Sequence, residues 1–284
     1  MSAAPLLPSN TNSTRSVHFR TLIGSSAAIV AGAIFAAIAF TVGAASHSVA
    51  VMGGGPALVV VAVVLIAWVK ADSDAEDEFF RRYADVHRLN LWPKYSLDGF
   101  TPLLAGGDRR HCEHWMEAGG HGLGWYTFEV RQDHGDKPDT WESHDFTLAT
   151  VDIGELGMGR FQGVYLRRRR GIFDRLDGDA NWLRGHNLKK VELESTAFTE
   201  RYELSAERDQ DDIILRQLFA PSFVVWLSEH PLEPGFELRA GMLVVFIPGR
   251  CGEAGRLQFL QMAADEISKR IQAELTAAAQ AGAL

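Results

Sequence analysis

One uncharged run dominates the sequence, because no Lys, Arg, Asp or Glu occurs anywhere in residues 21–69. These 49 residues are more than twice the ~20 that cross a bilayer as a single helix. The run is interrupted near its middle by the polar tripeptide Ser46-His47-Ser48. We therefore predict a transmembrane hairpin with helices at about 21–45 and 49–69, preceded by a disordered N-terminal segment over residues 1–20.

The cations that flank this run predict its orientation. Arg15 and Arg20 precede the first helix, whereas Lys70, Arg81 and Arg82 follow the second, and the connection between the helices carries no charge. Cytoplasmic segments next to membrane helices are enriched in Lys and Arg. We expect a multi-pass protein of the cell (plasma) membrane, the inner membrane of a bacterium, with both termini in the cytoplasm.

A cleaved signal peptide is the alternative for the first helix, with Gly43-Ala44-Ala45 as the cleavage site. Its apolar stretch of about 25 residues exceeds the ~7–15 of a signal peptide, and the second segment would still hold the body in the cytoplasm. The first helix also has small residues at every fourth position, namely Gly24, Ala28, Gly32 and Ala36. Such a stripe fits contact with the second helix or with another chain. The expected partners are therefore the lipid bilayer and, through the hairpin, a protein partner or a second copy.

The remaining chain has the composition of a folded and acidic body. Residues 70–284 carry 26 Lys and Arg against 36 Asp and Glu, a net charge of −10, which argues against nucleic acid as a partner. Hydrophobic residues make up 46% of the whole chain and provide ample material for a core.

Changes in hydrophobic period along the body predict its elements. Helical spacing of Phe79, Tyr83, Val86 and Leu89 predicts a helical stalk over residues 70–92, which Pro93 would end. Alternating apolar and polar residues then predict strands near 125–130, 141–153, 161–166 and 191–204, and a hairpin over 236–247 that turns at Ala240-Gly241. Helical spacing returns over 211–229, with a break before Pro221, and in a long amphipathic helix whose stripe is Leu257, Leu260, Ala264, Ile267, Ile271 and Leu275.

Strands followed by helices, without strict βαβ alternation, indicate an α+β fold with a largely antiparallel sheet. The predicted architecture is the N-terminal transmembrane hairpin, the stalk, and a cytoplasmic α+β domain over residues 93–284 that ends in the long amphipathic helix.

The segment from Val191 to Gly249 carries a resemblance to a known family. It contains VELES, then F-x-x-x-Y-x-L, then D-x-x-x-x-R-x-L-F-x-P-x-F-x-x-W-L, followed by a hairpin. This pattern resembles a family of bacterial membrane proteins whose domain has no assigned function. The stretches Thr101–Leu104, Gly107–Arg109 and Tyr126–Val130 are similar to the same family. The resemblance implies two N-terminal membrane helices and a cytoplasmic α+β domain, and it implies no activity.

The cluster His111, Cys112 and His114 contains the ligand types that zinc uses. One helical turn would bring the two histidines together, and Cys112 next to a histidine could also act as a nucleophile. A closed zinc site needs four ligands, however, and Cys251 lies far away in the sequence. The alternative is an ordinary polar turn of a surface helix. We predict no metal site and no cofactor, with these three residues as the only weak metal candidates.

Glycines recur in Gly119-Gly120-His121-Gly122-Leu123-Gly124. Phosphate-binding loops follow a strand and open a helix, whereas this segment precedes a strand-like run. We therefore interpret it as a turn that leads into a strand.

Four consecutive arginines, Arg167, Arg168, Arg169 and Arg170, form the strongest positive feature of the body. Guanidinium groups bind lipid headgroups and other phosphates well, so the four are candidates for binding anionic lipid or another anionic ligand. The alternative is a solvated loop that pairs with nearby acids such as Asp174 and Asp177.

No motif for a catalytic residue was found. The first hypothesis is a non-enzymatic, membrane-anchored cytoplasmic domain with a binding or regulatory role. The alternative is a membrane-bound enzyme, possibly a hydrolase, with a site near His111–His121.

Overall fold

The structure is a computed structural model that describes residues 10–11, 49–133, 139–169 and 187–280. Its contacts divide the chain into two units. The first unit contains helix α3, Val49–His87, and the second contains a nine-stranded sheet with the helices that pack on it. The predicted membrane helix at 21–45 lies outside the described residues.

Helix α3 is continuous over the second predicted membrane segment and most of the predicted stalk. Its C-terminal part has a buried stripe made by Ala71, Ala75, Phe79, Tyr83 and neighbouring residues. Of the four residues predicted for this stripe, Phe79 and Tyr83 are buried, whereas Val86 is exposed and Leu89 lies beyond the end of the helix. Among the residues whose side chains are described, no helix is both long and apolar enough to span a membrane.

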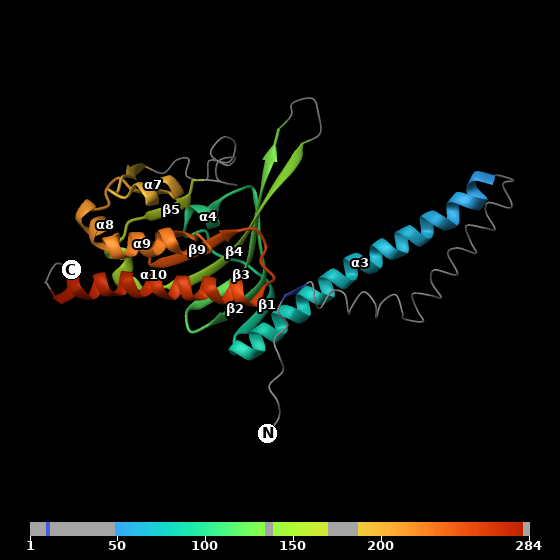
Figure 1. The fold of residues 1–284 in the computed structure, drawn as a ribbon, viewed down its shortest axis with the longest axis horizontal. Coiled ribbons are helices and arrows are strands. Elements are labelled where there is room, and N and C mark those ends of the chain that lie inside the picture. The colour runs from blue at the N-terminus through green and yellow to red at the C-terminus, as the bar shows by residue number, and fades with distance from the viewer. Residues whose placement is uncertain (1–9, 12–48, 134–138, 170–186, 281–284) are drawn as a thin grey trace, which may run out of the picture. The chain divides into compact units, whose positions relative to one another are not determined.

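The sheet of the second unit has the strand order β1-β2-β3-β4-β9-β8-β5-β7-β6, and all neighbouring strands are antiparallel. Figure 1 shows the long central strands and the helices beside them. The strands are β1 Asn90–Tyr95, β2 Arg109–Ala118, β3 His121–Gln132, β4 Thr140–Asp152, β5 Val164–Arg168, β6 Leu188–Val191, β7 Tyr202–Glu207, β8 Gly235–Arg239 and β9 Met242–Pro248.

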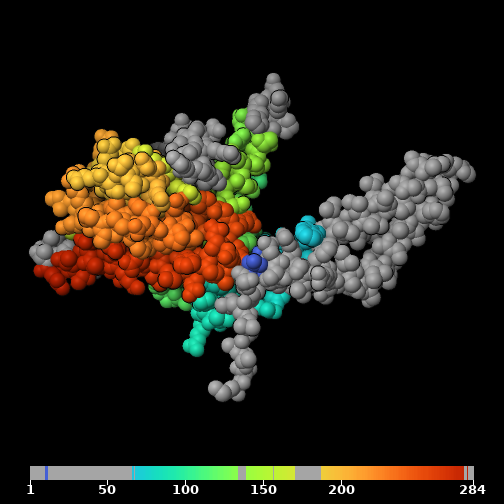
Figure 2. Space-filling view, in the orientation of Figure 1, coloured from blue at the N-terminus to red at the C-terminus, as the bar shows by residue number. Residues whose placement is uncertain are grey.

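One face of the sheet is covered by helices α7 to α10, which are α7 Thr196–Arg201, α8 Asp212–Leu218, α9 Pro221–Glu229 and α10 Ala254–Gln280. The ring of Phe236 on β8 stacks on Phe219 after α8, with centroids 6.0 Å apart, and also contacts Phe223 on α9. In the space-filling view α9 and α10 form one continuous surface in front of the strands (Figure 2).

The opposite face carries a second apolar cluster and the short helix α4, Pro102–Ala105. The Tyr126 hydroxyl lies within hydrogen-bonding distance of the carbonyls of Leu103 and Leu104, 3.2 and 3.0 Å away. This contact fixes α4 and the loop before it against the β2–β3–β4 part of the sheet. A further short helix, α5 Glu155–Arg160, follows β4.

The predicted α+β class, the antiparallel sheet and the long C-terminal helix are confirmed. All six predicted stripe residues of α10 are buried. The predicted helix break also occurs, since α8 ends at Leu218 and α9 begins at Pro221, where a missing N–H leaves no bond unmade. The predicted hairpin turns at Ala240-Gly241, both at positive φ.

Three local predictions are wrong. The segment 191–204, predicted as strand, contains helix α7, and only its two ends belong to β6 and β7. The stalk helix ends at His87, before Pro93, because Arg88 adopts a left-handed conformation with φ of 56°. Pro93 instead lies in β1, an edge strand, where a residue without an N–H is tolerated. The segment with His111 and His114 is strand β2 and not a helical turn.

Candidate functional site

A row of residues across four strands forms the base of the candidate site. The register pairs Asn90 on β1 with Glu117 on β2, Glu117 with Gly122 on β3, and Gly122 with Thr150 on β4. Directly paired residues place their side chains on the same face of a sheet. Because Gly122 has no side chain, the row is open between Glu117 and Thr150.

Trp115 fills part of this opening. A β-bulge between Glu113 and Met116 shifts the register of β2, and His114 in the bulge has a φ of 50°. The indole then lies over β3, where a Cβ atom at Gly122 would be 2.0 Å from Cζ2 of Trp115 and one at Gly124 would be 2.8 Å from its Cε3. Both glycines are therefore required for the indole to lie here.

The β2–β3 turn explains the other two glycines of this segment. Gly119 and Gly120 connect the paired residues Ala118 and His121, and their φ angles are 58° and 82°. Two central residues at positive φ are typical of the tight turns that suit a hairpin. The segment thus forms a hairpin turn and then the start of β3, where two glycines leave space for the Trp115 indole. This agrees with the prediction of a turn that leads into a strand.

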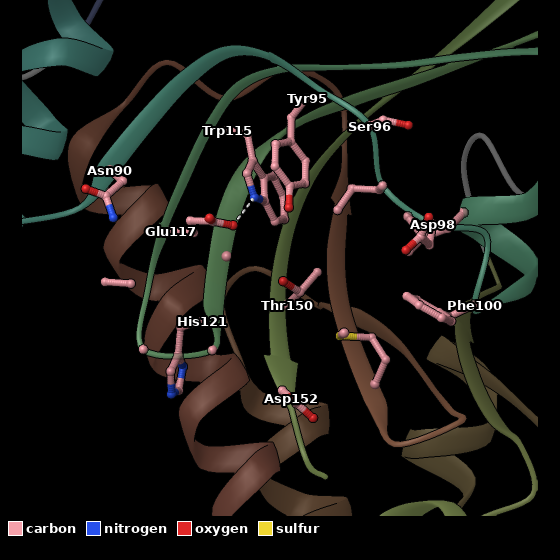
Figure 3. Close-up of a pocket in the computed structure, with 17 residues that line it drawn as sticks. Asn90, Tyr95, Ser96, Asp98, Phe100, Trp115, Glu117, His121, Thr150 and Asp152 are labelled. Atoms are coloured by element: carbon pink, nitrogen blue, oxygen red, sulfur yellow. Dashed lines mark hydrogen bonds between the residues drawn. The ribbon is translucent and has the colours of Figure 1, made fainter. Parts of the chain in front are cut away.

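Tyr95 stacks on Trp115 with ring centroids 5.5 Å apart and an interplanar angle of 16°. Together with the loop after β1 and the ends of β2, β3 and β4, these rings enclose a cavity of about 410 Å³, which we call the Tyr95–Trp115 pocket. Figure 3 shows the two rings side by side, with Glu117, His121, Thr150 and Asp152 around them. The volume is within the range of small-molecule sites, roughly 300–1,000 Å³.

Three carboxylates line the pocket, from Asp98, Glu117 and Asp152. Glu117 accepts a hydrogen bond from Nε1 of Trp115 at 3.1 Å, and Asp152 accepts one from the backbone N–H of Gly154 at 2.8 Å. These bonds orient two of the carboxylates. Loss of hydration, followed by the charges of Glu117 and Asp98, raises the pKa of the Tyr95 hydroxyl above its usual value.

Counter-charges are scarce around these carboxylates. Within the described part of the chain, no Lys or Arg lines the pocket or forms an ion pair with any of the three. The imidazole of His121 lies at the edge of the pocket, and its Nδ1 is 3.4 Å from Oδ1 of Asp265 on α10. The pocket therefore has a negative potential.

Thr150, a largely buried residue, contributes its hydroxyl to the pocket. The residue is 7% exposed, and no described residue forms a hydrogen bond with its Oγ1. Most buried polar side chains have such a partner. This hydroxyl is thus available to water or to a ligand in the pocket.

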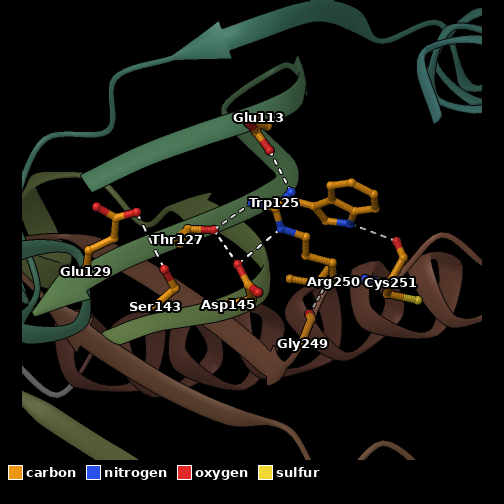
Figure 4. A network of polar contacts seen from close by, with 10 residues as sticks. Glu113, Trp125, Thr127, Glu129, Ser143, Asp145, Gly249, Arg250 and Cys251 are labelled. Carbon is orange, nitrogen blue, oxygen red and sulfur yellow. Dashed lines mark hydrogen bonds and ion pairs between the residues drawn. The ribbon is translucent and has the colours of Figure 1, made fainter. Parts of the chain in front are cut away.

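A second polar cluster lies on the other face of β2, β3 and β4 and is shown in Figure 4. Its centre is Arg250, whose guanidinium pairs with Glu113 at 2.9 Å and with Asp145 at 3.1 Å and donates to Oγ1 of Thr127 at 3.2 Å. Thr127 in turn donates to Asp145 at 2.6 Å. We call these four residues the Arg250 network.

The Arg250 network holds the chain that connects β9 to α10. Nε1 of Trp125 donates to the carbonyl of Cys251 at 2.9 Å, and the Arg250 guanidinium lies over the Trp125 ring at 5.5 Å from its centroid. Thr147 accepts from the Cys251 N–H and donates to the carbonyl of Gly249. Every group here has a protein partner, which indicates a structural role.

The weak metal candidates do not come together. His111 pairs with Thr127 on the face of the Arg250 network, whereas Cys112 pairs with Tyr126 and lies in the core of the opposite face. The ring of His114 packs edge-on against Trp125 at 5.1 Å. No group of three or more His, Cys, Asp or Glu within the described ranges is placed to hold a metal ion.

Cys112 is also poorly suited to act as a nucleophile. Its side chain is buried, and burial, together with the charge of Glu113, raises the pKa of the thiol far above its usual value. His111 and Cys112 line a second cavity of about 420 Å³, which contains charges of both signs, from Lys94, Arg110, Asp108 and Glu113.

The four arginines differ in their environments. Arg167 is buried, with Nη2 at 3.8 Å from Glu203, and Arg168 forms an ion pair with Glu233. The N–H of Arg169 donates to the carbonyl of Arg201. Arg170 lies outside the described residues. Two of the four guanidinium groups therefore already interact with acids of the same domain.

A buried carboxylate, Glu237 on β8, was not singled out in the sequence. It is fully buried, its Oε2 accepts from the N–H of Leu103 at 2.8 Å, and its Oε1 has no hydrogen-bond partner. Burial raises the pKa of Glu237 to about 7. Hydrogen bonding with Thr101 and with the Leu103 backbone, and the charges of nearby arginines, lower this pKa but do not cancel the effect of burial. Its neighbours in the sequence, Phe236 and Leu238, are ordinary core residues, so the sequence carries no signal for it.

The residues of the Tyr95–Trp115 pocket were also missed. They come from strands β1, β2, β3, β4 and β9, helix α4, the loop after β1 and the β2–β3 turn, and the strand register brings them together. The glycine run was the one available signal, because glycines within a strand often mark close approach of another group.

Comparison with protein-family models, with curated proteins and with solved structures finds no match.

Proposed function

We propose that this protein is a membrane-anchored cytoplasmic binding domain that takes a small ligand, or a single side chain of a partner, in the Tyr95–Trp115 pocket. The anchor is the hairpin of residues 21–45 and 49–69, with both chain termini in the cytoplasm. The role is binding and not catalysis.

One observation carries the proposal, namely that the pocket is a preformed cavity with an aromatic wall and polar groups on several sides. Gly122 and Gly124 make room for Trp115, and Tyr95 stacks on the indole. Glu117 is held in place by the indole N–H. Preformed cavities with an apolar wall and a few oriented polar groups are typical of small-molecule sites.

The chemistry of the pocket favours binding over covalent catalysis. Its lining contains carboxylates, hydroxyls, an amide and one imidazole, but no thiol. Nδ1 of His121 lies 3.4 Å from Asp265, and among the described residues no Ser, Thr or Cys forms a hydrogen bond with His121, as a nucleophile would with its base. These groups can orient a ligand without breaking a bond in it.

Binding can be tested on the full-length protein in detergent micelles with three probes of the same shape, 2-phenylethylammonium, 2-phenylethanol and 3-phenylpropionate. We expect saturation-transfer NMR to detect at least one probe on the wild type. Gly122→Val displaces the Trp115 indole that forms the pocket wall and should abolish the signal, and Tyr95→Leu should weaken it while leaving the fold intact by circular dichroism. Absence of a signal from all three probes, or unchanged signals in both variants, would contradict the binding function.

The membrane anchor is tested separately by cysteine labelling. Both native cysteines are buried, so a bulky membrane-impermeant maleimide should react little with the wild type. We expect Ser48→Cys, in the loop of the hairpin, to be labelled from outside intact cells, and Ser73→Cys, an exposed position on α3, only after the membrane is opened. Labelling of Ser73→Cys in intact cells would contradict the proposed topology.

A further inference from the structure

We propose that the ligand of the Tyr95–Trp115 pocket is an organic cation, an ammonium or guanidinium group on a short apolar stem. This inference rests on the proposed function and specifies the chemistry of the ligand.

The first support is the imbalance of charge in the pocket. Asp98, Glu117 and Asp152 contribute three carboxylates, whereas the one imidazole that lines the pocket is next to an acid of its own, Asp265. Charges in a partly enclosed cavity interact more strongly than charges in water. A cation would reduce the mutual repulsion of the three carboxylates, whereas an anion would increase it.

The second support is the set of hydrogen-bonding groups. An ammonium group donates three hydrogen bonds and accepts none, so it requires several acceptors in one place. The row across the sheet offers Glu117 on one side of Gly122 and the hydroxyl of Thr150 on the other. Thr150 is 7% exposed and no described residue hydrogen-bonds its hydroxyl, so this oxygen can accept a donor from a ligand in place of water.

The third support is the apolar side of the pocket. Tyr95 is 36% exposed, while Trp115, on which its ring stacks, is buried. One tyrosine face is therefore open to a cation, a contact that contributes roughly 0.5–1 kcal/mol at exposed sites. Leu97, Phe100 and Met242 line the remaining wall and fit an alkyl or aryl stem.

These features favour a cation over a sugar, the other ligand that aromatic walls often bind. A sugar presents donors and acceptors in similar numbers, whereas the described lining has three carboxylates, which only accept when ionised, and, apart from the Trp115 indole that is already bonded to Glu117, no side chain that only donates. The buried indole is also covered by Tyr95 on one side and by β3 on the other, which leaves no open indole face for a sugar ring.

The same chemistry has two sources, a free amine or guanidine and the Lys or Arg side chain of a partner protein. The peptide pair acetyl-Gly-Gly-Lys-Gly-Gly-amide and its norleucine analogue separates them. If the Lys peptide binds more tightly than 2-phenylethylammonium, the site is a receptor for a basic side chain. If the peptide does not bind and 2-phenylethylammonium does, the ligand is a free molecule.

The test compares the affinities of the three phenyl probes for the full-length protein in micelles. At about 50 mM salt we expect 2-phenylethylammonium to bind about tenfold more tightly than 2-phenylethanol and 3-phenylpropionate to bind most weakly. The preference should decrease as salt is added. If the alcohol or the carboxylate binds as tightly as the ammonium, the inference is overturned while the binding function stands. If no probe binds, both fail.

Charge-neutralising variants show which carboxylates cause the preference for the ammonium probe. Glu117→Gln and Asp152→Asn should each weaken binding of 2-phenylethylammonium about three- to tenfold and leave binding of 2-phenylethanol unchanged. Glu200→Gln is the matched control, since it removes the same charge from an exposed position on α7. An equal loss of affinity in this control would show that only the net charge of the protein attracts the probe, and would overturn the inference.

Discussion

The Arg250 network and the Tyr95–Trp115 pocket use the same kinds of residue in opposite ways. In the network, two carboxylates and a threonine surround one guanidinium, and each has a protein partner. In the pocket, three carboxylates and a threonine surround a cavity, and no described Lys or Arg pairs with them. The first arrangement stabilises a loop. The second leaves electrostatic and hydrogen-bonding capacity unused, which is what a binding site requires.

Glu237 shows a third way in which this fold accommodates a carboxylate. It has no described ion pair, but burial favours its protonated form, whereas among the pocket carboxylates Asp98 and Asp152 are exposed and Glu117 is half-buried. The three environments make different predictions for substitution, which can confirm or contradict the distinction between them.

The largest expected effect is that of Gly122→Ala, because the new methyl group would be 2.0 Å from Cζ2 of Trp115. The indole must move, and we expect a loss of roughly 3 kcal/mol in the free energy of unfolding, measured by urea titration in micelles. Gly159→Ala is the control, since nothing lies within 4 Å of its Cβ position in α5, and it should be neutral or slightly stabilising. Equal stability of both variants would contradict the role given to Gly122.

Between pH 5 and pH 8, the difference in unfolding free energy between Glu237→Gln and wild type should change by about 2–3 kcal/mol. The pKa is about 7 in the folded state and near 4.5 when unfolded, so the folded protein binds more protons between these values. The contribution of Glu237 to stability is therefore complete below pH 4.5 and is lost as the pH rises through 7. Because Gln does not titrate, the variant should gain stability relative to wild type between pH 5 and pH 8.

The measurement is urea unfolding of both proteins at pH 5, 6, 7 and 8. Glu229→Gln, at the exposed end of α9, is the matched control because it removes a carboxyl group outside the core. A constant difference for Glu237→Gln would mean that the carboxyl is ionised in the folded protein throughout this range.

Arg250→Met tests the network and should cost roughly 2 kcal/mol. The substitution leaves Glu113 and Asp145 without a cation and removes a donor to Thr127. The expected value is moderate because the guanidinium is 35% exposed and solvent weakens its ion pairs. Arg256→Met, at an exposed position in the first turn of α10, should change the unfolding free energy by less than about 0.5 kcal/mol. A similar small effect for Arg250→Met would show that the network does not stabilise the loop.

The fold could be predicted from the sequence wherever one side of an element is apolar at a regular spacing. The stripe of α10 and the alternation in β3 are examples, and both were predicted within a few residues. Strand β2 was missed because its bulge at His114 breaks the alternation, and β1 because it is an edge strand with mostly exposed side chains. The pocket could not be predicted, since Glu117, Gly122 and Thr150 become neighbours only through the register of three strands.

The sharpest comparison makes the same small substitution in both regions. Thr127→Val removes a hydroxyl that donates to Asp145 and accepts from Arg250, so we expect a loss of roughly 1–2 kcal/mol in unfolding free energy. Thr150→Val removes a hydroxyl without a described partner and keeps its shape, so stability should stay the same or rise by up to about 0.5 kcal/mol. Affinity for 2-phenylethylammonium should fall only in Thr150→Val. If Thr150→Val instead loses as much stability as Thr127→Val, the Thr150 hydroxyl is part of the fold and is not available to a ligand.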